Sequence, residues 1–105
     1  MTKITALFFG PAKDFTQGEE ETTLEFQETS VSLDNVLVAL SHKYGEKFAE
    51  YIYNSCGIAV NLEYVSLQID QEKSTFLEIL QNESLKQITL VEGDELTVIP
   101  PVSSG

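Results

Sequence analysis

One segment of the chain has the residue spacing of a long amphipathic helix, and segments on both sides of it alternate as β-strands do. Apolar residues recur there at the three- and four-residue intervals of one helical stripe: Leu33, Val36, Leu37, Leu40 and Tyr44. Ser32 is expected to cap this helix and Gly45 to end it. A single long helix among strands can bury its stripe only against a sheet, so the sequence predicts an α+β fold with one main helix on a sheet.

Four segments read as strands, and two weaker ones read as short helices. The strands are expected at residues 4–9, at residues 22–26, through Ile58, Val60 and Leu62, and at residues 95–99. The first two should pair as a hairpin, and residues 61–64 should turn. Short helices are expected at residues 47–53 and around Phe76, Leu77 and Leu80, the latter capped by Ser74 or Thr75. The stretch at residues 68–90 is otherwise hard to assign.

The first and last strands carry apolar residues on both faces. In residues 4–9 both alternating sets are largely apolar, and in residues 95–99 Ile99 points away from Leu96 and Val98. One helix covers only one face, so Leu7, Phe9 and Ile99 are expected to form an apolar patch on the other. Minor elements that cover this second face are the alternative.

Length and charge limit the classes of function. With 105 residues the chain has room for one domain and one core. Its 17 acidic residues against 6 basic ones give a net charge of -11, which opposes binding to nucleic acid or to an anionic membrane. A basic protein partner is favoured, with plain solubility as the alternative role of the charge.

The residues that usually supply catalysis or metal binding are sparse. Cys56 is the one cysteine, which excludes an internal disulfide and favours a reducing, cytosolic compartment. A buried packing role is the commoner one for such a cysteine, ahead of a nucleophile or persulfide carrier. His42 has no second ligand near it in the sequence, and the acidic run at residues 19–21 lacks the spacing of a calcium loop. No metal site is predicted, and no stretch approaches membrane-spanning length.

The C-terminal residues form the most informative motif. A turn signal at residues 92–94 precedes the last strand, and two prolines then prevent the strand from continuing because each lacks a backbone donor and fixes φ. The flexible tail expected beyond the strand is small and uncharged in its side chains: Pro100, Pro101, Val102, Ser103, Ser104 and Gly105. Such a tail suits a chain whose terminal carboxylate must enter the active site of another protein.

Three stretches resemble the small sulfur-carrier subunit of molybdopterin synthase. They are Leu-Phe-Phe-Gly at residues 7–10, Ala-Val-Asn-Leu-Glu-Tyr-Val at residues 59–65, and above all Glu-Gly-Asp-Glu-Leu-Thr-Val-Ile-Pro-Pro-Val-Ser at residues 92–103. The resemblance implies a ubiquitin-like β-grasp fold in a single domain over residues 1–105, with a flexible tail at residues 100–105. The family ends in Gly-Gly, whereas Ser104 is the penultimate residue here.

The resemblance also implies a chemistry for the tail. In the family, an activating enzyme uses ATP and magnesium to convert the terminal glycine carboxylate, here that of Gly105, to an acyl adenylate, and sulfur transfer then gives a thiocarboxylate. The large catalytic subunit takes this sulfur to cyclic pyranopterin monophosphate, within a heterotetramer. The chain itself would be a carrier with no bound cofactor and no catalytic residue of its own.

Family likeness places the partner-docking residues at Phe9, Tyr64 and Ile99, two of which strand alternation already puts on the second sheet face. Two alternatives stay open from the sequence. One is a related carrier for tRNA thiolation or thiamine synthesis, against which the Pro-Pro pair argues. The other is a ubiquitin-like interaction domain whose C-terminus is never activated, an option that Ser104 keeps open.

Overall fold

A mixed five-stranded sheet forms the frame of the molecule. The computed structural model describes residues 1–65 and 74–101. The strand order is β2-β1-β7-β4-β5, with the central pair β1 and β7 parallel and the other pairs antiparallel. The bounds are β1 (Thr2–Phe8), β2 (Glu21–Phe26), β4 (Gly57–Val60), β5 (Glu63–Tyr64) and β7 (Glu95–Ile99). The hairpin of the first two strands and the bounds of the last strand are as predicted.

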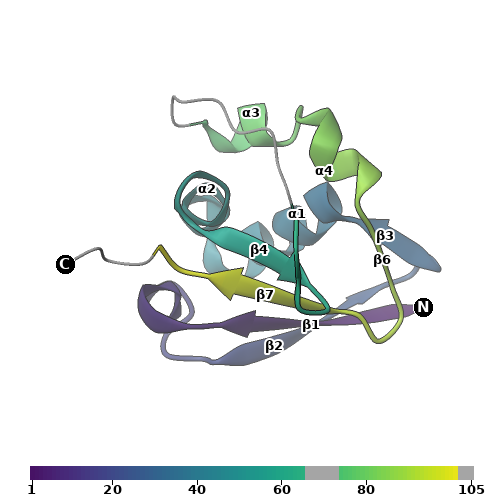
Figure 1. Ribbon diagram of the computed structural model, residues 1–105, viewed down its shortest axis with the longest axis horizontal. Coiled ribbons are helices and arrows are strands. Elements are labelled where there is room, and N and C mark those ends of the chain that lie inside the picture. Colours follow the sequence, from purple (N-terminus) through teal and green to yellow (C-terminus); the bar gives the residue numbers. More distant parts are fainter. Residues whose placement is uncertain (66–73, 102–105) are drawn as a thin grey trace.

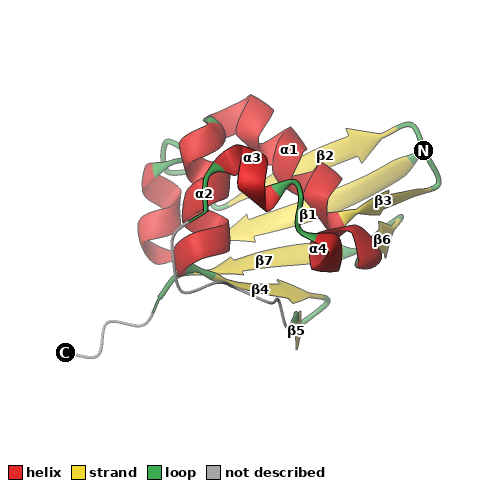
Figure 2. Cartoon of the chain, turned by 90° about the horizontal axis from the view of Figure 1, so that it is seen from above, coloured by secondary structure: helices red, strands yellow, loops and turns green. Residues whose placement is uncertain are grey.

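The described helices lie on one side of this sheet (Figures 1 and 2). Helix α1 (Leu33–Tyr44) has the predicted bounds, and α2 (Glu46–Ser55) follows it after Gly45, whose φ of 104° breaks the helix. The short helices α3 (Phe76–Ile79) and α4 (Glu83–Gln87) form an outer layer. The expectation of one main helix was therefore incomplete, because α2 is nearly as long as α1. No helix within residues 1–65 and 74–101 is long and apolar enough to span a membrane.

The core lies between the helices and the sheet. Alternate residues of β1 and β7 point into it together with the predicted stripe of α1 and one face of α2: Ile4, Ala6, Phe8, Leu96, Val98, Leu33, Val36, Leu37, Leu40, Phe48 and Ile52. The ring of Phe8 packs edge-on against the rings of Tyr44 and Phe48, with centroids 5.7 and 5.5 Å away. Phe15 stacks on Phe48 at 5.3 Å and so anchors the 3-10 helix η1 (Gly10–Asp14), which directly follows β1 and Phe9.

A second, two-stranded sheet was not predicted. Strand β3 (Ser30–Ser32) pairs antiparallel with β6 (Thr89–Val91), and the buried Val31 and Leu90 face each other in the register. Each of these strands has a single buried side chain, so no alternation of apolar and polar residues marks it in the sequence. The N-terminus of α1 is held here, because Leu33 N donates to the carbonyl of Ile88 at 2.8 Å.

Several boundaries differ from the predictions, and one residue was placed wrongly. Strand β1 covers residues 2–8, so Phe9 lies just beyond it. Leu62 does not belong to β4: it lies with Asn61 in a two-residue turn in which both have positive φ, 52° and 70°. The turn expected at residues 61–64 is confirmed for Asn61 and Leu62, whereas residues 63–64 form β5. The α1 cap was wrong in detail, since the Ser32 hydroxyl bonds to Asp34 and makes no bond to the helix backbone.

The predicted cap of the helix near residue 76 is confirmed at Thr75. Its hydroxyl accepts a hydrogen bond from the backbone N–H of Glu78, and the Glu78 carboxylate accepts one from the Thr75 N–H at 2.9 Å. Asn54 of α2 pairs with the backbone of Ser74 through two 2.9 Å hydrogen bonds. The segment that begins at Ser74, within the stretch that was hard to assign, is therefore attached to α2; residues 68–73 of that stretch lie outside the described ranges.

Candidate functional site: the open sheet face and the exit of the tail

The sheet face turned away from the helices carries an apolar row across four strands. Leu7 of β1 pairs with Thr97 of β7, Thr97 pairs with Ala59 of β4, and Ala59 pairs with Tyr64 of β5. Side chains of directly paired residues lie on the same face, and Thr97 alternates with the buried Leu96 and Val98. The row therefore lies on the face that the described helices leave uncovered. We call it, together with Phe9 and Ile99, the open sheet face.

The three predicted docking residues come together at one end of this face. Ile99 pairs with Gly57, and a Cβ atom added to Gly57 would lie 3.3 Å from Tyr64 Cε1 and 3.7 Å from Ile99 Cβ. The Tyr64 ring thus occupies the space that a side chain at Gly57 would need. Phe9 continues the extended backbone of β1 beyond the buried Phe8 and so points to the open side. The side chains of Phe9 and Tyr64 are 51% and 73% exposed.

The open face is divided into an apolar half and a polar half. Towards the start of β1 it carries Lys3, which pairs with Glu25 of β2 at 3.8 Å, and Thr5, which lies opposite Glu95 of β7. Towards the end of β7 it carries the apolar residues described above. Because β1 and β7 are parallel, both strands end at the apolar half. A partner that binds by apolar contact would therefore be guided to the end of β7.

The predicted tail leaves the fold at this same end. Pro100 follows β7 and packs against Gly10, which follows Phe9: a Cβ atom on Gly10 would lie 3.2 Å from Pro100 Cγ. Gly10 also has a φ of 56°, which favours glycine. Pro101, the last described residue, is exposed. The other predicted tail residues, Val102, Ser103, Ser104 and Gly105, lie outside the described ranges.

The turn before β7 is a structural element. Asp94 accepts hydrogen bonds from Val91 N at 2.8 Å and from Asn61 Nδ2 at 3.0 Å, and Asn61 Oδ1 accepts one from Glu95 N at 2.9 Å. Glu92 accepts a bond from Lys3 N at 2.7 Å. These bonds tie the β6–β7 turn to β1 and to the β4–β5 hairpin. The Gly-Asp-Glu signature therefore fixes the strand that carries the tail and the hairpin that carries Tyr64.

The other candidate residues of the sequence fall outside this site. Cys56 follows α2 and packs half-buried against the core, and burial raises the pKa of its thiol to about 11, although a hydrogen bond with Tyr51 opposes the shift. A thiol with that pKa is protonated at neutral pH, which fits the packing role. His42 and residues 19–21 are exposed. Among the described residues no three His, Cys, Asp or Glu side chains are grouped so as to hold a metal ion.

Two contributors to the open sheet face and one exposed turn residue were not predicted. Gly57 makes room for the Tyr64 ring. Thr97 lies at the centre of the row with its hydroxyl oxygen buried and without a hydrogen-bond partner among the described residues. Leu62, in the turn before β5, is 83% exposed. Residues 61–64 were expected to turn, but an Asn-Leu pair lacks the glycine that usually marks a two-residue turn, and Leu62 was also counted in a strand, so its exposure was not predicted.

The parallel central pair, the antiparallel strands on either side and the helices packed across one face define a ubiquitin-like protein of the β-grasp class. Solved structures agree. A Pyrococcus furiosus protein described as a candidate molybdopterin converting factor subunit 1 matches with a TM-score of 0.66 at 23% identity, over 97% of this chain and 100% of that one. The fold class predicted from the sequence is confirmed.

Sequence relatives then give the family, although no protein-family model matches the chain. The molybdopterin synthase sulfur carrier subunit of Pyrenophora tritici-repentis is 33% identical over 94% of this chain and 86% of its own length. The subunit of the same name from Emericella nidulans is 40% identical over 70% of this chain and 69% of its own length. The chain belongs to the family of molybdopterin synthase sulfur carrier subunits, and the sulfur-carrier function predicted from the sequence is confirmed.

One solved structure of this group contains a complex. The protein–protein complex of subunits 1 and 2 of molybdopterin-converting factor from Helicobacter pylori includes a chain that matches with a TM-score of 0.54 at 25% identity. The match covers 99% of the present chain and 100% of the Helicobacter chain.

Proposed function

We propose that the chain delivers sulfur from the carboxylate of Gly105 to cyclic pyranopterin monophosphate in the active site of the large catalytic subunit of molybdopterin synthase. The observation that carries the proposal is the position of the apolar half of the open sheet face at the end of β7, beside Pro100. A partner docked on Phe9, Tyr64 and Ile99 stands next to the point from which the tail departs.

The two prolines support this geometry. Pro100 and Pro101 each fix φ and offer no backbone donor, so neither can extend the sheet ladder with β1 or β4. Pro100 is also held against Gly10. The direction in which the tail starts is thus set by the folded domain, and the reach into the partner is left to the small residues that follow. Glycine at the reacting end leaves room for close approach to the carboxyl carbon.

The chemistry is divided between the chain and its partners. An ATP-dependent activating enzyme, with magnesium, transfers AMP to the Gly105 carboxylate with loss of pyrophosphate, and a sulfur donor then displaces AMP to leave a thiocarboxylate. Adenylation is needed because a carboxylate is a poor electrophile, and the thiocarboxylate is nucleophilic at neutral pH. The chain supplies the carried group and the docking face, in a non-catalytic role. A cytosolic location and a heterotetramer of two small and two large subunits belong to the same proposal.

A reconstituted reaction tests the proposal. The chain is prepared as the Gly105 thiocarboxylate and mixed with the large subunit of the same species and cyclic pyranopterin monophosphate, and the pterin products are analysed by mass spectrometry. Sulfur is expected in the pterin, with the chain returned to its carboxylate form. The matched control is the same chain with an ordinary carboxylate. Absence of sulfur from the pterin would favour the alternative of an interaction domain.

A further inference from the structure

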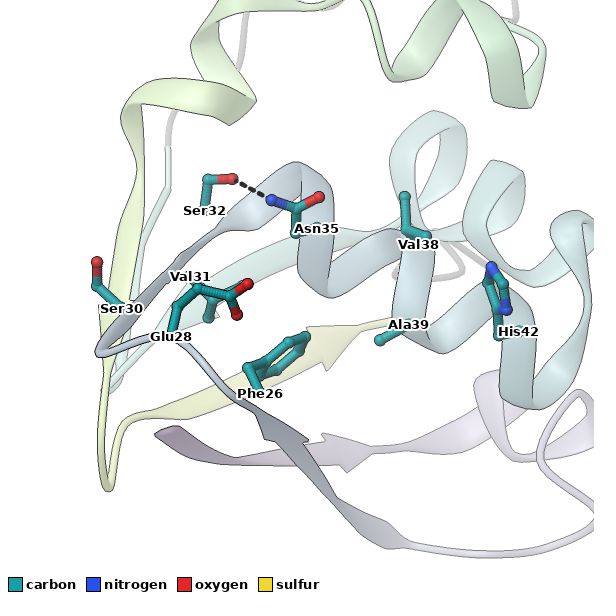
Figure 3. A pocket seen from close by; sticks show the side chains of 9 residues that line it. All are labelled: Phe26, Glu28, Ser30, Val31, Ser32, Asn35, Val38, Ala39 and His42. Carbon is teal, nitrogen blue, oxygen red and sulfur yellow. Dashed lines mark hydrogen bonds between the residues drawn. The ribbon is translucent and has the colours of Figure 1, made fainter. Parts of the chain in front are cut away.

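A groove beside β2, at the edge of the main sheet opposite β5, plays no part in the proposed carrier function. A cavity of about 560 Å³ lies between α1 and the end of β2 (Figure 3). Its apolar lining includes Phe26 of β2 and Val38 and Ala39 of α1, all half-buried. Figure 3 shows the Phe26 ring and Ala39 on facing walls, with Glu28 towards one end of the groove and His42 towards the other. We call it the β2–α1 groove.

One wall of this groove is a strand with a free edge. Strand β2 is the outermost strand of the main sheet at this side. Phe8 N donates to Glu20 O at 2.9 Å, which makes Phe8 and Glu20 a hydrogen-bonded pair of the β1–β2 ladder. In an antiparallel ladder such pairs alternate with pairs that do not bond to each other, so every second residue of β2 after Glu20 bonds to β1. The N–H and C=O groups of Glu21, Thr23 and Glu25 therefore point away from β1. They can pair with an added strand, as sheet edges do in many peptide-binding domains.

The charges around the groove favour a basic occupant. Glu28 lines the groove, and among the described residues no cation forms an ion pair with its carboxylate. No lysine or arginine lines the cavity as described. Lys43, near the other end, is hydrogen-bonded to the Thr22 hydroxyl, and Tyr44 donates to Glu19. Both contacts involve residues outside the cavity lining, so Lys43 and its hydrogen-bond partner leave Glu28 as the charged group of the lining.

We propose that the β2–α1 groove binds an extended, basic segment of a partner protein, which adds to the edge of β2. Alternate side chains of that segment would lie on Phe26, Val38 and Ala39, and a lysine or arginine would face Glu28. A strand added at about 4.8 Å from β2 occupies the side of the sheet farthest from β5. This partner can therefore bind while the open sheet face and the tail are engaged elsewhere.

Selection from a display library of random peptides, about ten residues long, tests the proposal. The full chain is the bait, and the selected peptides are synthesised and mapped by amide chemical-shift changes. Enrichment of peptides with alternating β-branched residues and a lysine or arginine is expected, with shift changes at Thr23, Glu25 and Ala39. No enrichment, enrichment of acidic peptides, or shift changes confined to Phe9 and Ile99 would overturn the proposal.

Variants then separate backbone pairing at the edge of β2 from side-chain contacts in the groove. Thr23→Pro removes one outward donor, Ala39→Arg fills the groove, and Glu28→Lys reverses its charge; each is expected to weaken binding about tenfold or more. Tyr64→Ala, on the open sheet face, should leave it unchanged. Urea unfolding checks that each variant folds, and Glu28→Lys, at an exposed position, tests the groove if Thr23→Pro or the half-buried Ala39→Arg does not fold. Binding that survives both Thr23→Pro and Ala39→Arg would contradict the proposed mode.

Discussion

Gly10 and Pro100 are in contact at the point where the tail leaves the domain: a Cβ atom on Gly10 would lie 3.2 Å from Pro100 Cγ. The two residues follow the parallel central strands β1 and β7, which are far apart in the sequence and adjacent in the sheet. Because β1 is anchored in the core through Phe8, the contact links the tail to the most buried part of the molecule.

Gly10→Ala should disturb the exit of the tail. Its φ of 56° is unfavourable for alanine, and the added methyl group pushes against Pro100. We expect a loss of about 1–2 kcal/mol in the free energy of unfolding, measured in urea, together with slower sulfur transfer from Gly105. Gly18→Ala is the matched control, because Gly18 has a φ of 87° and no heavy atom within 4 Å of the added Cβ. Equal effects of both variants on sulfur transfer would show that the Pro100 contact is irrelevant.

Substitutions on the open sheet face should weaken docking to the large subunit. Tyr64→Ala removes an aromatic contact and is expected to cost about 2 kcal/mol of binding free energy, and Ile99→Asp should abolish measurable binding because it buries a charge. Titration calorimetry with the large subunit measures both. Leu77→Asp is the control, since Leu77 is 71% exposed on α3, among the helices on the other side of the sheet. Full binding by Ile99→Asp would refute the docking face.

Thr97→Val should stabilise the protein without affecting docking. The buried Thr97 hydroxyl lacks a hydrogen-bond partner among the described residues, whereas valine has the same shape and suits a central strand. We expect a gain of about 1 kcal/mol in the free energy of unfolding in urea. Thr23→Val, at an exposed position on the same sheet face, should change little. A loss of stability in Thr97→Val would mean that the hydroxyl has a partner in solution.

Cys56 should be unreactive in the folded protein and dispensable for sulfur transfer. Burial raises the pKa of its thiol from 9.0 to about 11, which lowers the thiolate fraction at neutral pH about 100-fold. Alkylation by iodoacetamide should therefore be slow, should accelerate as the pH rises towards 11, and should become fast in urea. Cys56→Ala should still accept sulfur at Gly105. If Cys56→Ala gained no sulfur at Gly105, the result would support the persulfide-carrier role that the sequence left open for Cys56.

The elements that were predicted well are those whose signals are local. Helix α1 has an uninterrupted stripe and a glycine after it, and β7 has a turn before it and a proline after it, so both sets of bounds follow from neighbouring residues. Strands β3 and β6 have only three residues each and exist through pairing between distant segments. Nothing local marks them, and the same holds for the two residues of β5.

The positions of the docking residues on the open sheet face followed from the sequence for some residues and not for others. Alternation along β1 and β7 was enough to place Phe9 and Ile99 on the face away from the helices. Tyr64 lies in β5, which was expected to be a turn, so its place rested on family resemblance alone. Leu62 was counted in a strand because an apolar residue fits alternation, and it also lay within the turn expected at residues 61–64; the backbone adopts positive φ there and turns the chain. The roles of these residues in docking remain predictions.

Intact mass spectrometry tests the central claim most directly. The chain is incubated with the activating enzyme of the same species, ATP, magnesium and a sulfur donor, beside a Ser104→Gly variant that has the Gly-Gly end of the family. Replacement of one oxygen by sulfur adds about 16 Da, and we predict this gain in the C-terminal peptide that contains Gly105. A gain in the variant alone would mean that Ser104 blocks activation. An unchanged mass in both chains would contradict the sulfur-carrier account.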